Sequence, residues 1–491
     1  MLALIFCAVI STGCGGGSDS SDPEQTESLN DDTGSYEPNS GGRGKSSTKV
    51  DLSNITAAYT VHDGETLTGK LGSMVKISVA DGATVTLSDV TIRGIGLAQY
   101  RWAGLTCEGN ATIILEGTNF VRGFNSSYPG IRVLEGKTLT IKGSGSLEAR
   151  SNGYGAGIGG GWEIPCGNIV IEGGTITANA GMFAAVISGN WAAGIGGGYA
   201  SNCGNIIIDG GTINATGGTC AAGIGGGRYG KCGNITITNN ITRVTATKDV
   251  YHSPYSIGGG QDGSCGTVTM GGLVTGPIAE YQYTYTGTID LSKITADYTA
   301  QDGELLTGKL GREVKISVAD GAAITLYDVT IEGYNKSSTP WAGLTCRGVA
   351  ALILMGTNYV QRAHEDYPAI YVPEYHMLNI TGSGELTADA NGSYSAGIGG
   401  GEWSSCGNIF IDGGTIEAIG GRYSAGIGGG RYGNCGYITI KDTVTKVKAT
   451  KGEDAPYSIG AGKNGSCSTV MIGDDIGSRS DPTCTYPPDA Q

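Results

Sequence analysis

The sequence has too little of several features that define large protein classes. Its 491 residues include 89 glycines but only 13 prolines, and the glycines do not recur at every third position, so a collagen triple helix is excluded. Basic residues are outnumbered, with 31 Lys and Arg against 45 Asp and Glu. The net charge of −14 argues against a nucleic-acid partner and against binding to an anionic membrane surface.

Histidine is scarce as well, and its positions are scattered rather than grouped with cysteines. A zinc site needs such a cluster of ligands, so we expect no metal and no cofactor. Helical periodicity is also missing, because no stretch repeats its apolar residues every 3.6 positions, which predicts few helices. The four histidines are His62, His252, His364 and His376.

Long apolar runs are absent after the first residues of the chain. Residues 1–14 begin with about ten apolar residues, too few for a membrane-spanning helix, and end in Ser-Thr-Gly-Cys. This ending resembles a bacterial lipobox, which implies lipidation of Cys14; an ordinary secretory signal is the alternative. Residues 15–48, rich in Ser, Gly, Asp and Glu, are predicted to be a flexible, disordered tether. We expect a protein outside the cytoplasm, at the cell surface, held to a bacterial membrane by its lipid alone.

The remainder of the chain is an internal duplication. Residues 50–94 return almost unchanged as residues 289–333, and both copies contain the letters VKISVADGA. We place block 1 at 50–278 and block 2 at 289–475, with a tail at 476–491. Shorter markers repeat inside both blocks every 26 to 33 residues in most cases, and block 1 has one marker more than block 2. Such a period is typical of a solenoid.

Each short repeat has the pattern of β-strands. In residues 166–178, CGNIVIEGGTITA, Ile169 and Ile171 share one face, and Ile176 and Ala178 share one face after a Gly-Gly break. This alternation with a period of two, in a segment rich in β-branched residues, predicts strands. Three strands and three turns per repeat predict an all-β, parallel β-helix whose stacked coils bury one apolar column.

The repeated AGIGGG…CGNI motif, together with VKISVADGA, resembles a family of secreted bacterial surface proteins built from Gly-rich β-helix coils. The resemblance covers residues 50–475. It implies a right-handed parallel β-helix of the pectin-lyase type on the cell surface, with a role in glycan binding or adhesion.

The AGIGGG motif itself is not predicted to bind a nucleotide. Gly155, Gly157 and Gly160 match a dinucleotide-binding pattern, but a strand follows them where that site needs a helix. We expect the glycines to form a tight corner with positive φ. The alternative is that they expose a strip of bare backbone against which a ligand or a second surface packs. The isoleucines of the five copies should form a core ladder: Ile158, Ile195, Ile224, Ile398 and Ile427.

Four variable residues separate each glycine triplet from a cysteine, in seven loops of equal length. A constant frame with variable loops is how scaffolds present recognition residues. Aromatic rings suit the apolar faces of sugars, and repetition along a polymer adds avidity. The alternative is that the aromatic residues only cover the turns. The candidate ligand-binding residues are Trp162, Tyr199, Arg228, Tyr229, Trp403, Arg431 and Tyr432.

Two further ladders follow from the same register. Seven cysteines share one position, and we expect a ladder of buried thiols, with disulfides between neighbouring coils as the alternative. Four asparagines share another, where their side chains should satisfy the turn backbone. The cysteines are Cys166, Cys203, Cys232, Cys265, Cys406, Cys435 and Cys467, and the asparagines are Asn168, Asn205, Asn234 and Asn408.

No catalytic residue is assigned from the sequence. Glu172, Asp209 and Asp412 precede Gly-Gly breaks, and stacking could place such acids at glycosidase spacing, but they recur with the register and need no chemical explanation. We therefore predict a non-catalytic protein that binds a polysaccharide or a host or cell-surface glycan. The alternatives are a structural surface spacer and a polysaccharide lyase or glycoside hydrolase on a β-helix.

Overall fold

The structure is a computed structural model in which each block is a parallel β-helix. The predicted signal segment with Cys14, and all but the last residue of the predicted tether, lie outside the described residues. The residues that the structure describes are 48–181, 190–250, 252–311, 313–333 and 341–487.

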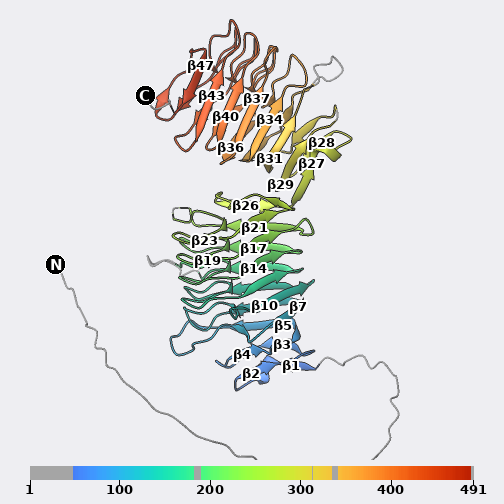
Figure 1. Ribbon diagram of the computed structural model, residues 1–491, viewed down its shortest axis with the longest axis vertical. Helices are drawn as coiled ribbons and strands as arrows, with labels where there is room; N and C mark the ends of the chain where they lie inside the picture. Colours follow the sequence, from blue (N-terminus) through green and yellow to red (C-terminus); the bar gives the residue numbers. More distant parts are fainter. Residues whose placement is uncertain (1–47, 182–189, 251, 312, 334–340, 488–491) are drawn as a thin grey trace, which may run out of the picture. The chain divides into compact units, whose positions relative to one another are not determined.

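A coil of the β-helix contains three short strands. In one coil of block 1 these are β13 (Asn168–Ile171), β14 (Thr175–Asn179) and β15 (Ile195–Gly196). Each pairs in parallel with its counterpart one coil further along. Figure 1 shows the rungs β14, β17 (Thr212–Thr216) and β21 (Arg243–Thr247) stacked in order. The predicted all-β, parallel β-helical fold is confirmed.

One face of each block is an all-parallel sheet. Within the described residues, this sheet has eight strands in block 1 and seven in block 2, which confirms the extra repeat of block 1. In block 1 the strands are β2 (Tyr59–Val61), β4 (Ile77–Val79), β6 (Leu105–Cys107), β9 (Ile131–Val133), β12 (Ile158–Gly159), β15, β18 (Ile224–Gly225) and β22 (Ile257–Gly258). In block 2 they are β28 (Tyr298–Ala300), β30 (Ile316–Val318), β32 (Leu344–Cys346), β35 (Ile370–Tyr371), β38 (Ile398–Gly399), β41 (Ile427–Gly428) and β44 (Ile459–Gly460).

In each block, one long strand runs through both of the other two faces. In block 1, β5 (Thr84–Arg93) pairs through its first half with β7 (Ala111–Glu116) and through its second half with β8 (Thr118–Arg122). The buried side chain of Asn119 supports this corner, because its carbonyl accepts from the Val90 N–H at 2.9 Å. In block 2, β31 (Ala323–Ile331) occupies the equivalent place, and Asn358 bonds Val329 in the same way at 3.0 Å.

Antiparallel strands close both blocks at their C-terminal ends. In block 1, β26 (Gln282–Tyr285) pairs with β21, and in block 2, β47 (Thr483–Tyr486) pairs with β43 (Lys446–Thr450). The strand β47 falls in the segment that the sequence suggested to be a tail. Within the described residues no sheet contains strands of both blocks, so each block is a separate solenoid.

Side chains, rather than a shared sheet, join the end of block 1 to the start of block 2. The fully buried Tyr283 of β26 hydrogen-bonds Thr325 of β31 at 3.1 Å, and Arg243 of β21 forms an ion pair with Asp302 at 2.9 Å. The blocks are therefore distinct in their backbone pairing but in contact through side chains.

The ladders predicted from the repeats are present. The isoleucines of the AGIGGG motif pair with one another between coils and are fully buried. Each side-chain carbonyl of the asparagine ladder accepts from a backbone N–H of the next coil, for example Asn168 from Asn205 at 2.8 Å and Asn408 from Tyr437 at 2.9 Å. The described helices are two 3-10 turns, Leu52–Asn54 and Leu291–Lys293, as the missing helical period predicts.

Candidate functional site

The seven four-residue loops repeat one unusual backbone conformation. The second residue of every loop has a positive φ, between 50° and 63°, although none of the seven is glycine. In the five loops that another loop follows in the same block, its N–H donates to the carbonyl of the first residue of the next loop, as from Trp403 to Arg431 at 2.8 Å and from Tyr229 to Gln261 at 3.0 Å. The loops therefore stack in register, and equivalent side chains form columns. The seven residues are Glu163, Ala200, Tyr229, Asp262, Trp403, Tyr432 and Asn464.

In block 1 this stacking gathers an aromatic cluster whose rings are tilted against one another. Tyr199 is its centre: its ring lies 6.0 Å from Trp162, 5.8 Å from Tyr229 and 4.7 Å from Trp191 between centroids, with interplanar angles of 45° to 69°. Arg228 lies over the Tyr229 ring at 4.6 Å. Most rings in this cluster therefore turn their faces towards other side chains.

In block 2 the rings stack flat. Trp403 and Tyr432 have centroids 3.8 Å apart and an interplanar angle of 12°, and Tyr394 stacks on Tyr423 at 8°. Arg431 lies between the two stacks, 4.9 Å from the Tyr423 ring and 4.7 Å from the Tyr432 ring. Trp403 is 72% exposed. Block 2 thus presents one broad aromatic face to solvent.

The structure brings the candidate residues of each block together. Trp162 and Tyr229 are 41% and 47% exposed, whereas Tyr199 and Tyr432 and both arginines are partly buried. The sequence reasoning missed the aromatic residues that pack against them. Each of these stands two residues before an AGIGGG copy, which is a signal that the repeats already contained: Tyr154, Trp191, Tyr394 and Tyr423.

The glycines of the motif do not form an exposed strip. All of Gly157, Gly159, Gly160 and Gly161 are buried. Gly159 has φ of 135°, and a Cβ added to it would lie 2.0 Å from the carbonyl oxygen of Gly196 in the next coil. The alternative interpretation, a bare strip that receives a ligand, is therefore wrong. The glycines allow neighbouring coils to approach at the corner, as the first interpretation held.

The cysteine ladder is part thiol and part disulfide. Disulfides join Cys203 to Cys232 and Cys435 to Cys467, with Cα–Cα distances of 4.6 and 4.5 Å. The expectation of a ladder made only of thiols is wrong for these pairs, because stacked coils bring the Cα atoms within the range that a disulfide spans. The remaining ladder members are thiols, and burial raises the pKa of Cys166 and of Cys406 to about 12.

Two of the recurring acids before the Gly-Gly breaks, Asp209 and Asp412, contact polar side chains of the next coil. Asp209 accepts from the Thr238 hydroxyl at 2.6 Å and from the Asn240 amide at 2.9 Å. Asp412 pairs with Lys441. These contacts agree with the structural role given to the acids from the sequence.

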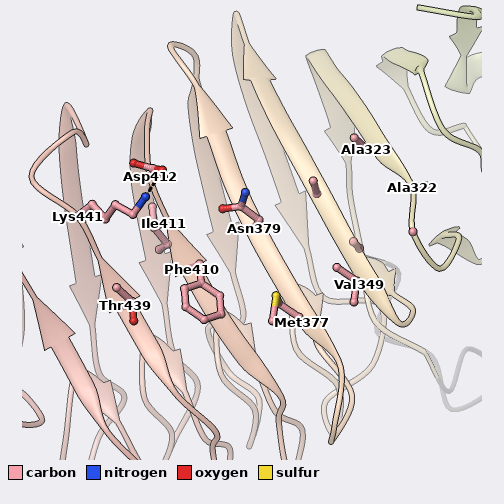
Figure 2. Close-up of a pocket in the computed structure, with 13 residues that line it drawn as sticks. Ala322, Ala323, Val349, Met377, Asn379, Phe410, Ile411, Asp412, Thr439 and Lys441 are labelled. Atoms are coloured by element: carbon pink, nitrogen blue, oxygen red, sulfur yellow. Dashed lines mark hydrogen bonds and ion pairs between the residues drawn. The ribbon is translucent and has the colours of Figure 1, made fainter. Parts of the chain in front are cut away.

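Asp412 and Lys441 also border a hollow of about 380 Å³ on the outer face of block 2 (Figure 2). Phe410 and Met377 line its middle, and Ala322 lies towards its other end. The pairing of Asp412 with Lys441 neutralises its two charged residues, so this hollow offers mainly apolar contact.

The described residues contain no group of three or more His, Cys, Asp or Glu side chains placed to hold a metal ion. They also contain no helix of sufficient length and hydropathy to cross a bilayer.

Comparison with known proteins agrees with this fold. A family model described as beta helix repeat matches five segments, which fall in both blocks and together cover about a quarter of the chain: 139–162, 169–199, 206–228, 378–402 and 411–431. No curated protein matches the chain, and no solved structure matches it. The fold and the family match together define a β-solenoid built from beta helix repeats.

Proposed function

We propose that the chain is a non-catalytic, glycan-binding β-solenoid whose aromatic loop residues hold a polysaccharide. The observation that carries the proposal is Trp403, which is 72% exposed and stacked flat on Tyr432. A large aromatic face costs about 1 kcal/mol or more to keep in water when it can be covered, and the C–H face of a pyranose covers it well.

The columns support a polymer as the ligand. Trp162, Tyr199 and Tyr229 occupy three consecutive coils of block 1, and Trp403 and Tyr432 occupy two in block 2. Coils repeat about 4.8 Å apart, close to the length of one pyranose unit. Several weak stacking contacts on one chain raise the total affinity without any single strong contact.

The place of action is part of the proposal. The amino-terminal segment, with its small residues before Cys14, supports lipidation and display outside the cytoplasm at a bacterial surface. The partner would then be a polysaccharide of the cell envelope or a host or cell-surface glycan, and the lipid would be the only link to the membrane.

Affinity electrophoresis in gels that contain a soluble polysaccharide tests the proposal. We expect Trp403→Ala to weaken retardation about tenfold or more, because the exposed face of the stack is lost. Tyr437→Ala is the matched control, since Tyr437 is a 54% exposed aromatic of the same block outside the four-residue loops. A folded wild-type chain that no polysaccharide retards would refute the proposal.

A structural spacer is the second candidate, and one observation favours it for block 1. The rings there are tilted into contact with one another at 44° to 69°, so they cover the loops themselves. If Trp162→Ala leaves glycan binding unchanged while lowering the thermal midpoint, block 1 acts as a support for block 2.

A further inference from the structure

A groove of about 500 Å³ opens in block 2 beside Trp403. It lies along the coil edge where the four-residue loop of β38 meets the preceding coil. Four aromatic side chains and two carboxylic acids line it: Trp341, Tyr367, Tyr371, Trp403, Asp366 and Glu402. The Tyr371 hydroxyl bonds the Ser404 hydroxyl at 2.6 Å, which fixes the orientation of the Tyr371 ring.

Block 1 has a different set of side chains at the same place. The backbone bond from Glu402 N–H to the Asp366 carbonyl, 3.0 Å, corresponds to the bond from Trp162 N–H to the Ser127 carbonyl, 2.8 Å. The paired acids of block 2 thus stand where block 1 has a tryptophan and a serine. The repeat register does not explain these acids, in contrast to the acids before the Gly-Gly breaks.

Other changes in block 2 open the space around the acids. In block 1 the ring of Phe124 lies 5.9 Å from Trp102, and in block 2 the corresponding residues are Ala363 and Trp341. Trp341 therefore lacks that aromatic neighbour and lines the groove. Several residues around the groove of block 2 thus differ from their block 1 equivalents, although the backbone is the same. This indicates that the groove has a function of its own.

The two acids of the groove come from neighbouring coils that are joined by the bond from the Glu402 N–H to the Asp366 carbonyl. The Glu402 side chain is only 14% exposed, and its oxygen accepts from Arg431 at 3.2 Å. Burial raises the pKa of Glu402, and so do a hydrogen bond and the negative charge from Asp366, against the opposing effect of Arg431. Asp366 in turn lies 3.5 Å from the His364 ring nitrogen. Two carboxyl groups that line one groove offer several acceptors to the hydroxyl groups of a ligand.

The charges at the groove balance. Lys315 lines it, and Arg431 contacts Glu402 from the next coil, so two cationic groups face two acids. A uronate would meet the acids and an amino sugar would meet the cations, so an uncharged ligand fits best. Carboxyl groups that accept from adjacent hydroxyls, next to an aromatic face, match a neutral pyranose.

We propose that this groove binds one uncharged pyranose residue of the glycan, with Asp366 and Glu402 hydrogen-bonded to adjacent hydroxyl groups and Trp403 against the C–H face. The inference rests on the proposed function and names the sugar class that block 2 selects. It also gives the two blocks different tasks, because block 1 lacks both acids.

The test is isothermal titration of the full chain with three probes of equal length: neutral glucan, polygalacturonate and chitosan oligosaccharides. We expect the neutral oligosaccharide to bind best, and both Asp366→Asn and Glu402→Gln to weaken it about tenfold or more. Asp366→Ser, which places the block 1 residue in block 2, is a second variant in case an amide disturbs folding. Glu417→Gln is the control, because Glu417 pairs with Lys448 outside the groove.

The outcomes separate this inference from the general one. If Trp403→Ala weakens binding but the acid variants leave it unchanged, the groove is not the sugar site although the chain still binds glycans. Preference for polygalacturonate or chitosan would also overturn the inference, as would release of shorter oligosaccharides from the neutral probe. If the folded wild-type chain binds none of the three probes, this inference fails, and the electrophoresis with further polysaccharides decides whether the proposed function fails as well.

Discussion

The two blocks share the same core and the same stacked turns but differ in the side chains of their four-residue loops. Both contain the isoleucine ladder, the buried asparagine at the corner of the long strand, and an antiparallel strand at the end. They differ in the loops, where block 1 has tilted rings and block 2 has a flat stack beside two acids.

This difference shows where the coil geometry leaves a choice of residue. The isoleucine ladder is fully buried, and each side chain pairs with isoleucine in the neighbouring coils, so the same residue type recurs there. In the four-residue loops the backbone bonds between coils do not depend on the side chain, and the side chains at the first two positions differ from loop to loop. Substitutions at these loop positions can therefore adapt the surface to a ligand, and several positions of block 2 differ together from their block 1 equivalents.

The largest expected effect tests the shared frame. A Cβ at Gly428 would lie 2.0 Å from the Gly460 carbonyl oxygen, and one at Gly196 would lie 2.1 Å from that of Gly225. We expect Gly428→Ala and Gly196→Ala each to lower the unfolding free energy of their block by about 3 kcal/mol or more, because the coils must separate. Hydrogen exchange followed by mass spectrometry reads each block separately.

Gly136→Ala is the control for this experiment. Gly136 has φ of 73° and no atom within 4 Å of an added Cβ, so only the backbone strain of about 1 kcal/mol should appear. Equal losses in the clash variants and the control would show that close approach between coils is not what requires these glycines.

Much of this frame could be predicted from the sequence, because one coil's neighbours are copies of itself. The alternation seen in Ile169 and Ile171 recurs in the equivalent strand of the other coils, so one repeat predicts the others. Equal loop lengths also predict that the loops stack. The pair Asp366 and Glu402 could not be found in this way, since its members come from consecutive coils at non-equivalent positions. The disulfides were predicted only as the alternative to a thiol ladder, because the shared register alone does not decide between them; the structure brings the Cα atoms of Cys203 and Cys232 to 4.6 Å, a distance that a disulfide spans.

The second prediction concerns the free thiols of the cysteine ladder. Block 1 has two of them, Cys166 and Cys265, and block 2 has one, Cys406. Burial raises the pKa of Cys166 and Cys406 to about 12, and a pKa this far above the usual 8.5 lowers the thiolate fraction about a thousandfold. Both should resist alkylation at pH 8 in the native state. Cys265 is only partly buried and should react first, while its block 2 equivalent, Cys467, is held in a disulfide.

Peptide mapping without reductant checks this prediction. Denatured protein should yield the linked pair that contains Cys467 and alkylated Cys166, Cys265 and Cys406. Rapid native labelling of Cys406, or a free Cys467, would contradict the arrangement.

The third prediction is a pH dependence that arises from Glu402 in block 2. The pKa of Glu402 is raised in the folded state, where Asp366 and Arg431 face it and His364 contacts Asp366. Its contribution to stability is therefore greatest at acidic pH and is lost as the pH rises through the folded pKa. Compared with Glu402→Gln, the wild type should be relatively most stable at acidic pH and should lose this advantage as the pH rises through the raised pKa of Glu402. Thermal midpoints of both proteins, measured from acidic to mildly alkaline pH, check this prediction, and a constant difference would contradict the raised pKa of Glu402.

The smallest effect tests the backbone of the loops. Ala200 in block 1 and Asn464 in block 2 occupy the same position, with φ of 50° and 63°. Alanine in this left-handed region costs about 1 kcal/mol, and asparagine less, since its side chain tolerates the conformation. Glycine relieves the strain but adds entropy to the unfolded chain, so Ala200→Gly should stabilise block 1 by no more than about 0.5 kcal/mol. Asn464→Gly should change block 2 by less, and denaturant titration compares the two. A larger gain for Asn464→Gly would mean that the identity of the loop residue, and not its backbone, limits the stability of the edge.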